Sequence, residues 1–139
     1  MRVKGLKVII DDINFTLKIT KSPDAISDLF IPPSVDLNDK KYFFSIIRRN
    51  SFEDNHNIKT IEFTNDSQLD TIENYAFSNS SLSKIIIPPS VTKIGEHVFN
   101  LCRNLKEVKF IGESSIQSFP KNSFYFTSIT EIFIPQSIT

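Results

Sequence analysis

Histidine and cysteine are the residues of this chain that could carry catalysis, and there are few of them. The sequence contains two histidines, His56 and His97, and one cysteine, Cys102. Nucleophilic catalysis needs a nucleophile, a base close to it and a group that orients the base. Both histidines fall in turns that follow or precede a phenylalanine, where a solvated turn residue is expected rather than a base. We therefore expect no catalytic residue in this chain.

Other sequence signals of chemistry are missing as well. The chain has no glycine-rich phosphate loop, no HExxH motif and no paired cysteines, so we expect no cofactor and no metal site. Cys102 has no second cysteine to pair with, which excludes a disulfide scaffold and a cysteine-based zinc site. Sixteen basic and sixteen acidic residues give a formal net charge of zero, which argues against a nucleic-acid partner. No apolar stretch approaches the roughly 20 residues of a membrane span, so we expect no membrane insertion.

An internal repeat dominates the rest of the chain, which at 139 residues and 40% hydrophobic content is long enough for one domain. Three segments, 58–81, 82–104 and 105–128, begin 24 and 23 residues apart, and a partial segment, 129–139, begins 24 residues later. Each opens with apolar residues in the pattern φxxφxφ, where φ is apolar and x is any residue. A phenylalanine recurs in phase with the repeat, at Phe52, Phe77, Phe99 and Phe124.

The pattern extends backwards into an earlier and longer repeat. The pentapeptide IPPSV occurs at 31–35 and again at 87–91, but nine extra residues within 36–46 follow the first copy. Basic and aromatic residues mix in the segment 36–49, which could suggest an RNA or membrane contact. We favour a plainer interpretation, in which Phe43, Phe44, Ile46 and Ile47 cap the core and the charges face water.

Units of about 23 residues cannot bury their own apolar side, so they must stack side by side. The repeat therefore predicts a solenoid over 26–139, with one short parallel strand per unit, the four repeat phenylalanines stacked behind it, and Pro88 and Pro135 ending strands. Residues 1–25 alternate apolar and polar residues on both sides of Asp11 and Asp12. This alternation predicts a capping β-hairpin whose buried face includes Ile13 and Phe15.

The block 82–110, LSKIIIPPSVTKIGEHVFNLCRNLKEVKF, resembles the repeat of the BspA-like leucine-rich repeat proteins. Strand, IPxSV, xIG and F-xx-C motifs occur there in phase, although Gly95 is the only glycine of the xIG type and Ala76 the only alanine before a repeat phenylalanine. The resemblance implies a leucine-rich-repeat solenoid with a curved sheet and a convex side of loops or short helices. It also implies that Cys102, at the family's own cysteine position, is a small buried hydrophobe. The family's members are surface proteins of anaerobic bacteria and parasitic protists that act in adhesion and bind host matrix proteins.

Strand alternation predicts which side chains the solenoid exposes for binding. Two positions in each φxxφxφ strand point out on the open face, which we expect to be concave. The first row of outward residues is Asp28, Thr60, Lys84, Glu107 and Glu131, and the second is Phe30, Glu62, Ile86, Lys109 and Phe133. Solvent-facing Phe30, Ile86 and Phe133 favour a binding surface, since solenoids bind partners on such faces. The alternative is that neighbouring side chains cover them or that they are scattered surface hydrophobes.

These observations predict a non-enzymatic module that binds a protein, in adhesion or as a host-matrix interaction. An intracellular interaction scaffold and a structural spacer of a longer repeat protein are the alternatives. The resemblance implies a cell-surface or secreted location, whereas the absence of a visible signal peptide would fit the cytoplasm. Asn14, Asn65 and Asn79 match the glycosylation motif, which matters only after export. The last repeat is incomplete, so we expect its open edge to favour self-association.

Overall fold

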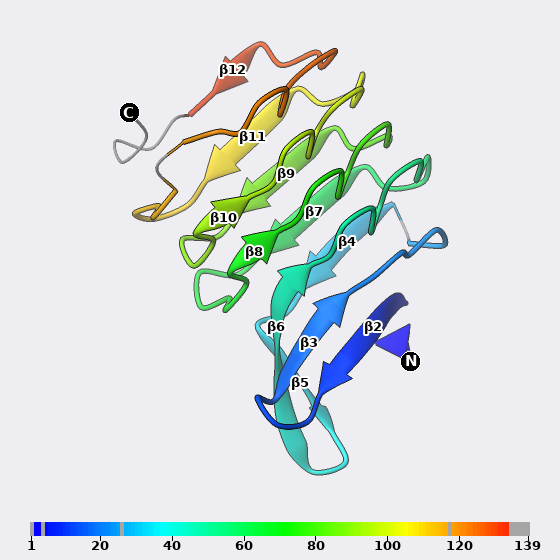
Figure 1. Cartoon of the computed structure of the whole chain (residues 1–139), viewed down its shortest axis with the longest axis vertical. Helices are drawn as coiled ribbons and strands as arrows, with labels where there is room; N and C mark the ends of the chain where they lie inside the picture. The colour runs from blue at the N-terminus through cyan, green and yellow to red at the C-terminus, as the bar shows by residue number, and fades with distance from the viewer. Residues whose placement is uncertain (1, 4, 26, 117, 134–139) are drawn as a thin grey trace.

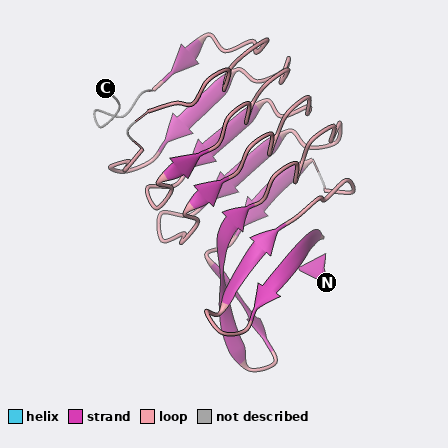
Figure 2. Ribbon diagram, in the orientation of Figure 1, coloured by secondary structure: helices cyan, strands magenta, loops and turns pink. Residues whose placement is uncertain are grey.

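Two β-sheets run along opposite sides of a flattened coil in the computed structural model of the chain (Figure 1, Figure 2). The structure describes residues 2–3, 5–25, 27–116 and 118–133. Three residues that the repeat pattern predicts in strands or at a strand end, Ile26, Ile134 and Pro135, lie outside the described residues. The predicted solenoid is confirmed, because in each repeat the chain passes from one side of the coil to the other and returns one step further along (Figure 1).

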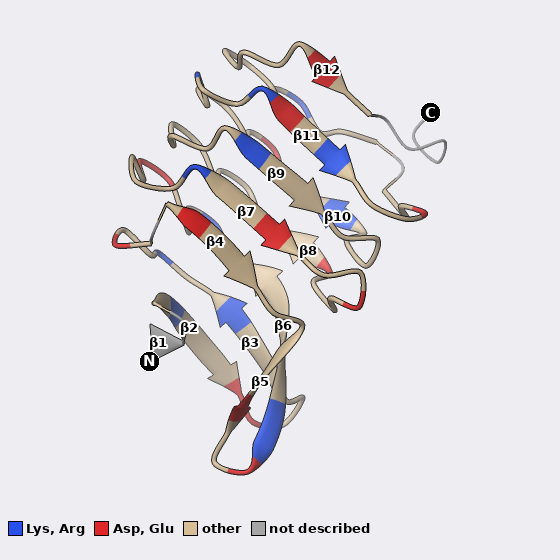
Figure 3. Cartoon of the chain, turned by 180° about the vertical axis from the view of Figure 1, so that it is seen from behind, with Lys and Arg blue, Asp and Glu red and all other residues tan. Residues whose placement is uncertain are grey.

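The sheet that faces the viewer in Figure 3, the front sheet, contains the strands that the φxxφxφ pattern predicts. Neighbouring strands are parallel throughout, in the order β4, β7, β9, β11, β12. Their bounds are β4 Asp28–Ile31, β7 Thr60–Phe63, β9 Lys84–Ile87, β11 Glu107–Phe110 and β12 Glu131–Ile132. Inward residues such as Leu29, Ile61, Ile85 and Val108 are buried in the core. β9 ends at Ile87, directly before Pro88, as expected of a residue without an N–H for the ladder.

The back of the solenoid differs from the expectation of loops or short helices. The described residues contain no helix, and two repeats have a second parallel strand on this side, β8 Thr71–Ile72 and β10 Lys93–Ile94. β8 also pairs in parallel with the longer strand β6, Lys40–Ile47. Ile72 and Ile94 are buried, and the Gly95 N–H donates to the Ile72 carbonyl at 2.8 Å. Two residues per strand carry too little alternation to be recognised from the sequence.

The four repeat phenylalanines form a stack along one edge of the solenoid, as their spacing predicts. Ring centroids are 5.2 Å apart for Phe52 and Phe77, 5.7 Å for Phe77 and Phe99, and 5.6 Å for Phe99 and Phe124, with the rings within 13° of parallel. Each such pair contributes about 1 kcal/mol beyond the burial of its area. The N–H of a stacked Phe donates to the carbonyl before the next one, as from Phe77 to Val98 at 3.0 Å.

The turns around this stack hold residues in the left-handed region of backbone conformation. The residues two before and two after each stacked phenylalanine have φ between 52° and 60°. They are Asn50, Asp54, Tyr75, Asn79, His97, Leu101, Asn122 and Phe126. The N–H groups of the first six continue the hydrogen-bonded ladder, as from Leu101 to the Tyr125 carbonyl at 2.8 Å. The ladder therefore holds a conformation that Tyr, His and Leu rarely adopt.

The predicted N-terminal hairpin is present as β2 Leu6–Asp11 and β3 Thr16–Ile19, which pair antiparallel, and β1 Arg2–Val3 pairs with β2. The expectation that Ile13 and Phe15 are buried is wrong, because their side chains are 88% and 42% exposed. The Asp11 carboxylate accepts the N–H groups of Ile13 and Asn14 at 3.1 and 3.0 Å. This local hydrogen bonding makes residues 12–15 a turn.

The extra residues of the first repeat form a second hairpin. β5, Ser34–Leu37, pairs antiparallel with β6, and Asn38 and Asp39 in the turn between them have φ of 50° and 60°. β6 also pairs in parallel with β3, so the N-terminal hairpin and the repeats share one sheet. The expected core cap is right for Phe44 and Ile47, which are buried, whereas Phe43 and Ile46 are half-buried on the other side of β6.

Candidate functional site

The two predicted rows of side chains lie on the outer face of the front sheet. In β4 the residues Asp28 and Phe30 are exposed while Leu29 and Ile31 are buried, and β7 and β9 repeat the alternation. The strand register places Asp28 beside Thr60, and Phe30 beside Glu62. It also aligns the later members of both rows, Lys84 with Glu107, Glu107 with Glu131, and Ile86 with Lys109. Figure 3 shows this face, with the charged residues interspersed along the strands.

The first row is held by polar contacts between neighbouring strands. The Thr60 hydroxyl donates to a carboxylate oxygen of Asp28 at 2.9 Å. The Lys84 ammonium lies 3.8 Å from a carboxylate oxygen of Glu107, and a partly exposed pair of this kind contributes a few tenths of a kcal/mol. Glu131 lies on the other side of Glu107, so two carboxylates are adjacent at the β12 end of the row.

The second row presents apolar side chains to solvent. Phe30 is 57% exposed and Phe133 is 62% exposed, so the alternative in which neighbouring side chains cover them does not apply to these two. Ile86, between them, is half-buried. Phe30 lies on β4 and Phe133 directly follows β12, so the two exposed rings stand at opposite ends of this sheet.

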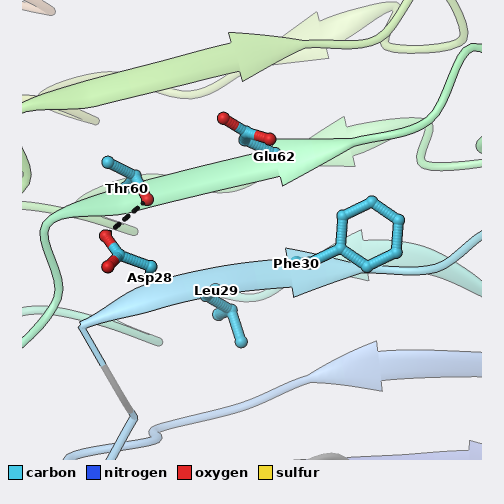
Figure 4. A pocket seen from close by; sticks show the side chains of 5 residues that line it. All are labelled: Asp28, Leu29, Phe30, Thr60 and Glu62. Carbon is cyan, nitrogen blue, oxygen red and sulfur yellow. Dashed lines mark hydrogen bonds between the residues drawn. The ribbon is translucent and has the colours of Figure 1, made fainter.

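A shallow depression of about 250 Å³ lies at the β4 end of this face (Figure 4). Asp28, Leu29, Phe30, Thr60 and Glu62 line it. Figure 4 shows the Phe30 ring and the Glu62 carboxylate standing on the same side of the sheet, with the Asp28 and Thr60 side chains joined by their hydrogen bond. The depression therefore combines two carboxylates with an exposed aromatic ring.

Comparison with known protein families matches residues 33–139 to the BspA type leucine-rich repeat region, in 6 copies. The chain belongs to the BspA-type leucine-rich repeat family. The sequence resemblance is thereby confirmed, although the match begins at 33 rather than 26. No functionally curated protein matches the sequence.

Solved structures share the BspA-type fold at low sequence identity. A leucine-rich cell surface protein from Faecalibacterium prausnitzii A2-165 is 21% identical with a TM-score of 0.69, over 100% of this chain and 43% of that one. The pneumococcal vaccine antigen PcpA is 16% identical with a TM-score of 0.57, over 94% of this chain and 47% of that one. The T. pallidum leucine-rich repeat protein is 17% identical with a TM-score of 0.52, over 85% of this chain and 69% of that one. The chain thus spans less than half of the first two proteins.

The cysteine and the two histidines of this BspA-type chain lie in three different environments. Cys102 is buried, its thiol donates to the Phe77 carbonyl at 2.9 Å, and burial raises its pKa, so its interpretation as a small buried hydrophobe is confirmed. His56 is exposed, as expected. His97 is in a turn, as expected, but it is half-buried, and its ring stacks on Tyr75 with ring centroids 4.9 Å apart and ring planes 3° apart. Its left-handed backbone aligns the two rings in successive turns.

The described ranges lack two further features, a cluster of metal ligands and a membrane-spanning helix. No group of three or more His, Cys, Asp or Glu side chains in these ranges is placed to hold a metal ion. None of the structure's described segments is a helix with the length and apolar character needed to cross a bilayer.

Sequence reasoning missed two polar contacts away from the front face. The Tyr42 hydroxyl donates to the Asp12 carboxylate, and this bond raises the Tyr42 pKa. Asp70, just before β8, accepts from the Thr92 hydroxyl at 2.6 Å and from the Thr71 hydroxyl at 2.7 Å, and these bonds lower its pKa. No sequence motif marks either contact, because the partners meet only after the repeats stack.

The three glycosylation motifs lie in turns. Asn14 is in the first hairpin turn, where its amide donates to Asp11 at 2.8 Å. Asn65 is exposed in the turn after β7. The Asn79 amide donates to the Asp54 carboxylate of the preceding turn at 2.9 Å. A glycan would have to replace one amide hydrogen at each site.

Proposed function

We propose that this chain is a non-enzymatic module that binds another protein through the outer face of its front sheet. The observation that carries the proposal is the continuous face of two aligned rows, with Phe30 and Phe133 exposed among charged residues. Apolar anchors that become buried at the centre of an interface supply most of its binding energy, and surrounding charges give orientation and specificity. The site residues are those of the two rows.

A role in adhesion at the cell surface, with host matrix proteins as partners, is the finer form of this proposal. It is supported by the family and by solved neighbours described as a cell surface protein and a vaccine antigen. Those neighbours are at most 21% identical, so they support the fold directly and the location only by analogy. Self-association through the C-terminal repeat stays a separate prediction, which light scattering over a range of concentrations would test.

The proposal is tested by reversing the character of the second row. The double variant Phe30→Glu with Ile86→Lys places two charges among the apolar side chains, and we expect it to reduce binding to a confirmed partner at least tenfold. A matched control is Tyr125→Lys with Phe126→Glu, since these aromatic side chains are 57% and 55% exposed and lie in the turn after Phe124. Partners would be sought by parallel pull-down from host matrix proteins and from cell lysate.

Equal binding by the row variant and the parent chain would contradict the proposal. It would instead support a structural spacer, for which the front face has no partner. Reduced binding by both double variants would also count against it, because the loss would then not be specific to the front face.

A further inference from the structure

The apolar side chains of the second row lie on alternate strands. Phe30 is on β4, Ile86 is on β9 and Phe133 directly follows β12, while charged Glu62 and Lys109 occupy the same row on β7 and β11. Hydrogen-bonded neighbours in a sheet are roughly 4.8 Å apart, so apolar side chains recur about every 9.6 Å across this sheet. The parallel register aligns Phe30 with Glu62 and Ile86 with Lys109, and β12 continues it up to Ile132, the residue before Phe133.

This spacing distinguishes among the backbones that a partner could lay across the strands. A polyproline II helix rises about 3.1 Å per residue with three residues per turn, so one side of it repeats every 9.3 Å or so. An extended β-strand repeats every second residue, at about 6.8 Å, which cannot meet both Phe30 and Ile86. An α-helix repeats after seven residues, at about 10.5 Å. From Phe30 to Phe133 the mismatch accumulates to about 2 Å for the α-helix and about 0.6 Å for polyproline II.

The charges at the β4 end of the face indicate which side chain would accompany the apolar ones. Asp28 and Glu62 line the depression beside Phe30. Among the described residues no ion pair involves either carboxylate, and the nearest basic residue of the rows, Lys84, pairs with Glu107 instead. A cation from a partner would therefore meet two carboxylates and an aromatic ring, an arrangement that attracts Lys or Arg.

We propose that the front face binds a polyproline II segment of its partner, with an apolar side chain at every third position against Phe30, Ile86 and Phe133. A Lys or Arg of the segment occupies the depression between Asp28 and Glu62. This proposal rests on the proposed function, since it names the partner of the same face. A proline-rich segment loses little conformational entropy on binding, and aromatic side chains are its usual contacts in other proteins.

Synthetic peptides of defined spacing test the proposal directly. The probe is a fluorescent proline-rich peptide with an arginine at one end and a leucine at every third position. One control has leucine at every fourth position of a proline-rich chain, a second is α-helical with leucine at every seventh, and a third replaces the arginine by glutamate. Measured by fluorescence anisotropy with the full chain, the probe should bind at least tenfold more tightly than each control.

Variants of the protein locate the binding on the front face. The double variant Phe30→Glu with Ile86→Lys should lower the affinity for the probe at least tenfold, whereas Phe126→Glu should leave this affinity unchanged. Asp28→Asn with Glu62→Gln should remove the preference for arginine over glutamate while keeping the preference for leucine at every third position. Circular dichroism and thermal unfolding would confirm that each variant is folded.

Several results would overturn the proposal. One is equal affinity of the parent chain for the peptides with leucine at every third and at every fourth position. Another is tighter binding of the α-helical peptide than of the probe. A third is a loss of probe affinity in Phe126→Glu as large as that in the row variant. If the row variant loses a confirmed protein partner while no proline-rich peptide binds the parent chain, the proposed function stands and the polyproline II proposal fails. If the row variant keeps that partner, the proposed function itself fails.

Discussion

The pentapeptide IPPSV occurs twice in this chain and folds in two ways. At 87–91 the residues after Ile87 form a turn, in which the Val91 N–H donates to the Pro88 carbonyl at 3.2 Å and the Val91 side chain is fully buried. At 31–35 the Ser34–Leu37 segment is strand β5, and Val35 is half-buried opposite Tyr42. Five identical residues therefore give a turn in one repeat and a strand in another.

The number of residues that follow each copy explains the difference. Only two residues separate Val91 from Ile94 of the back strand, so the chain must turn at once to reach the other sheet. After Val35 the chain has the nine extra residues of the first repeat, which are enough to form a hairpin with Asn38 and Asp39 at its tip. Loop length thus decides the structure of the pentapeptide more strongly than its own residues do.

The largest expected effect comes from a substitution at Gly95, where the chain has crossed to the back strand after the second copy. An added Cβ at Gly95 would lie 2.4 Å from the Asn74 backbone nitrogen and 2.7 Å from the Glu73 carbonyl carbon. Because these are backbone atoms that cannot move cheaply, Gly95→Ala should lower the free energy of unfolding by about 3 kcal/mol or more. Urea denaturation at constant pH measures the change.

Gly112→Ala is the matched control for this prediction. Gly112 has φ of 68°, and an added Cβ would lie 3.4 Å from Pro89 of the same pentapeptide, an ordinary contact. We expect a loss of about 1 kcal/mol from the left-handed backbone alone. Similar losses for Gly95→Ala and Gly112→Ala would refute the steric explanation.

The two valines of the pentapeptides give the next largest effect. Val91→Ala removes two methyl groups from a fully buried site and should cost about 2 kcal/mol, whereas Val35→Ala at a half-buried site should cost less than about 1 kcal/mol. Thermal unfolding of both variants under the same conditions measures the difference. Equal costs would mean that the two copies are buried to the same degree in solution.

Much of the fold follows from the sequence, because each repeat forms a similar local structure and the whole chain is built by stacking these repeats. The strands of the front sheet, the outward rows and the stack of Phe52, Phe77, Phe99 and Phe124 all depend on residues that recur in phase. The back strands β8 and β10 could not be predicted, since two residues provide no alternation. Ile13 and Phe15 were placed wrongly because the Asp11 side chain ends the strand by a local hydrogen bond that outweighs their apolar character.

The candidate site was predictable to a different degree. The direction of each row residue follows from strand alternation, and the cross-strand pair of Lys84 with Glu107 follows from the stacking of the repeats. The depression at Asp28 and Glu62 could not be predicted, because it depends on side-chain conformations. The stack of His97 on Tyr75 was also missed, because neither residue type suggests a left-handed backbone. Only the hydrogen-bonded ladder between turns imposes that conformation.

A smaller effect concerns the hairpin that the first copy forms and the second lacks. Asp39 has φ of 60°, which glycine adopts without strain, and Asn-Gly is the preferred pair in such turns. Asp39→Gly should therefore raise the free energy of unfolding by about 0.5 to 1 kcal/mol. Asp36→Gly in β5, where φ is negative, should lower it, and urea denaturation compares them. Destabilisation by Asp39→Gly would show that the Asp39 side chain contributes more than its backbone conformation costs.

The smallest effect tests a contact that only the second copy makes. Thr92, directly after that copy, donates to Asp70 at 2.6 Å, and this bond is the main cause of the lowered Asp70 pKa. A carboxyl group whose pKa is lower in the folded state stabilises the fold above its unfolded pKa of about 4, and this contribution is lost as the pH falls through the folded pKa. Thr92→Val should therefore destabilise the chain at about pH 6, by less than about 1 kcal/mol because Asp70 is exposed, and the deficit should shrink toward about pH 2. Thr92→Ser keeps the hydroxyl and should retain the parent's pH dependence in thermal unfolding. A deficit in Thr92→Val that stays constant with pH would assign the effect to packing of the threonine side chain rather than to its bond with Asp70.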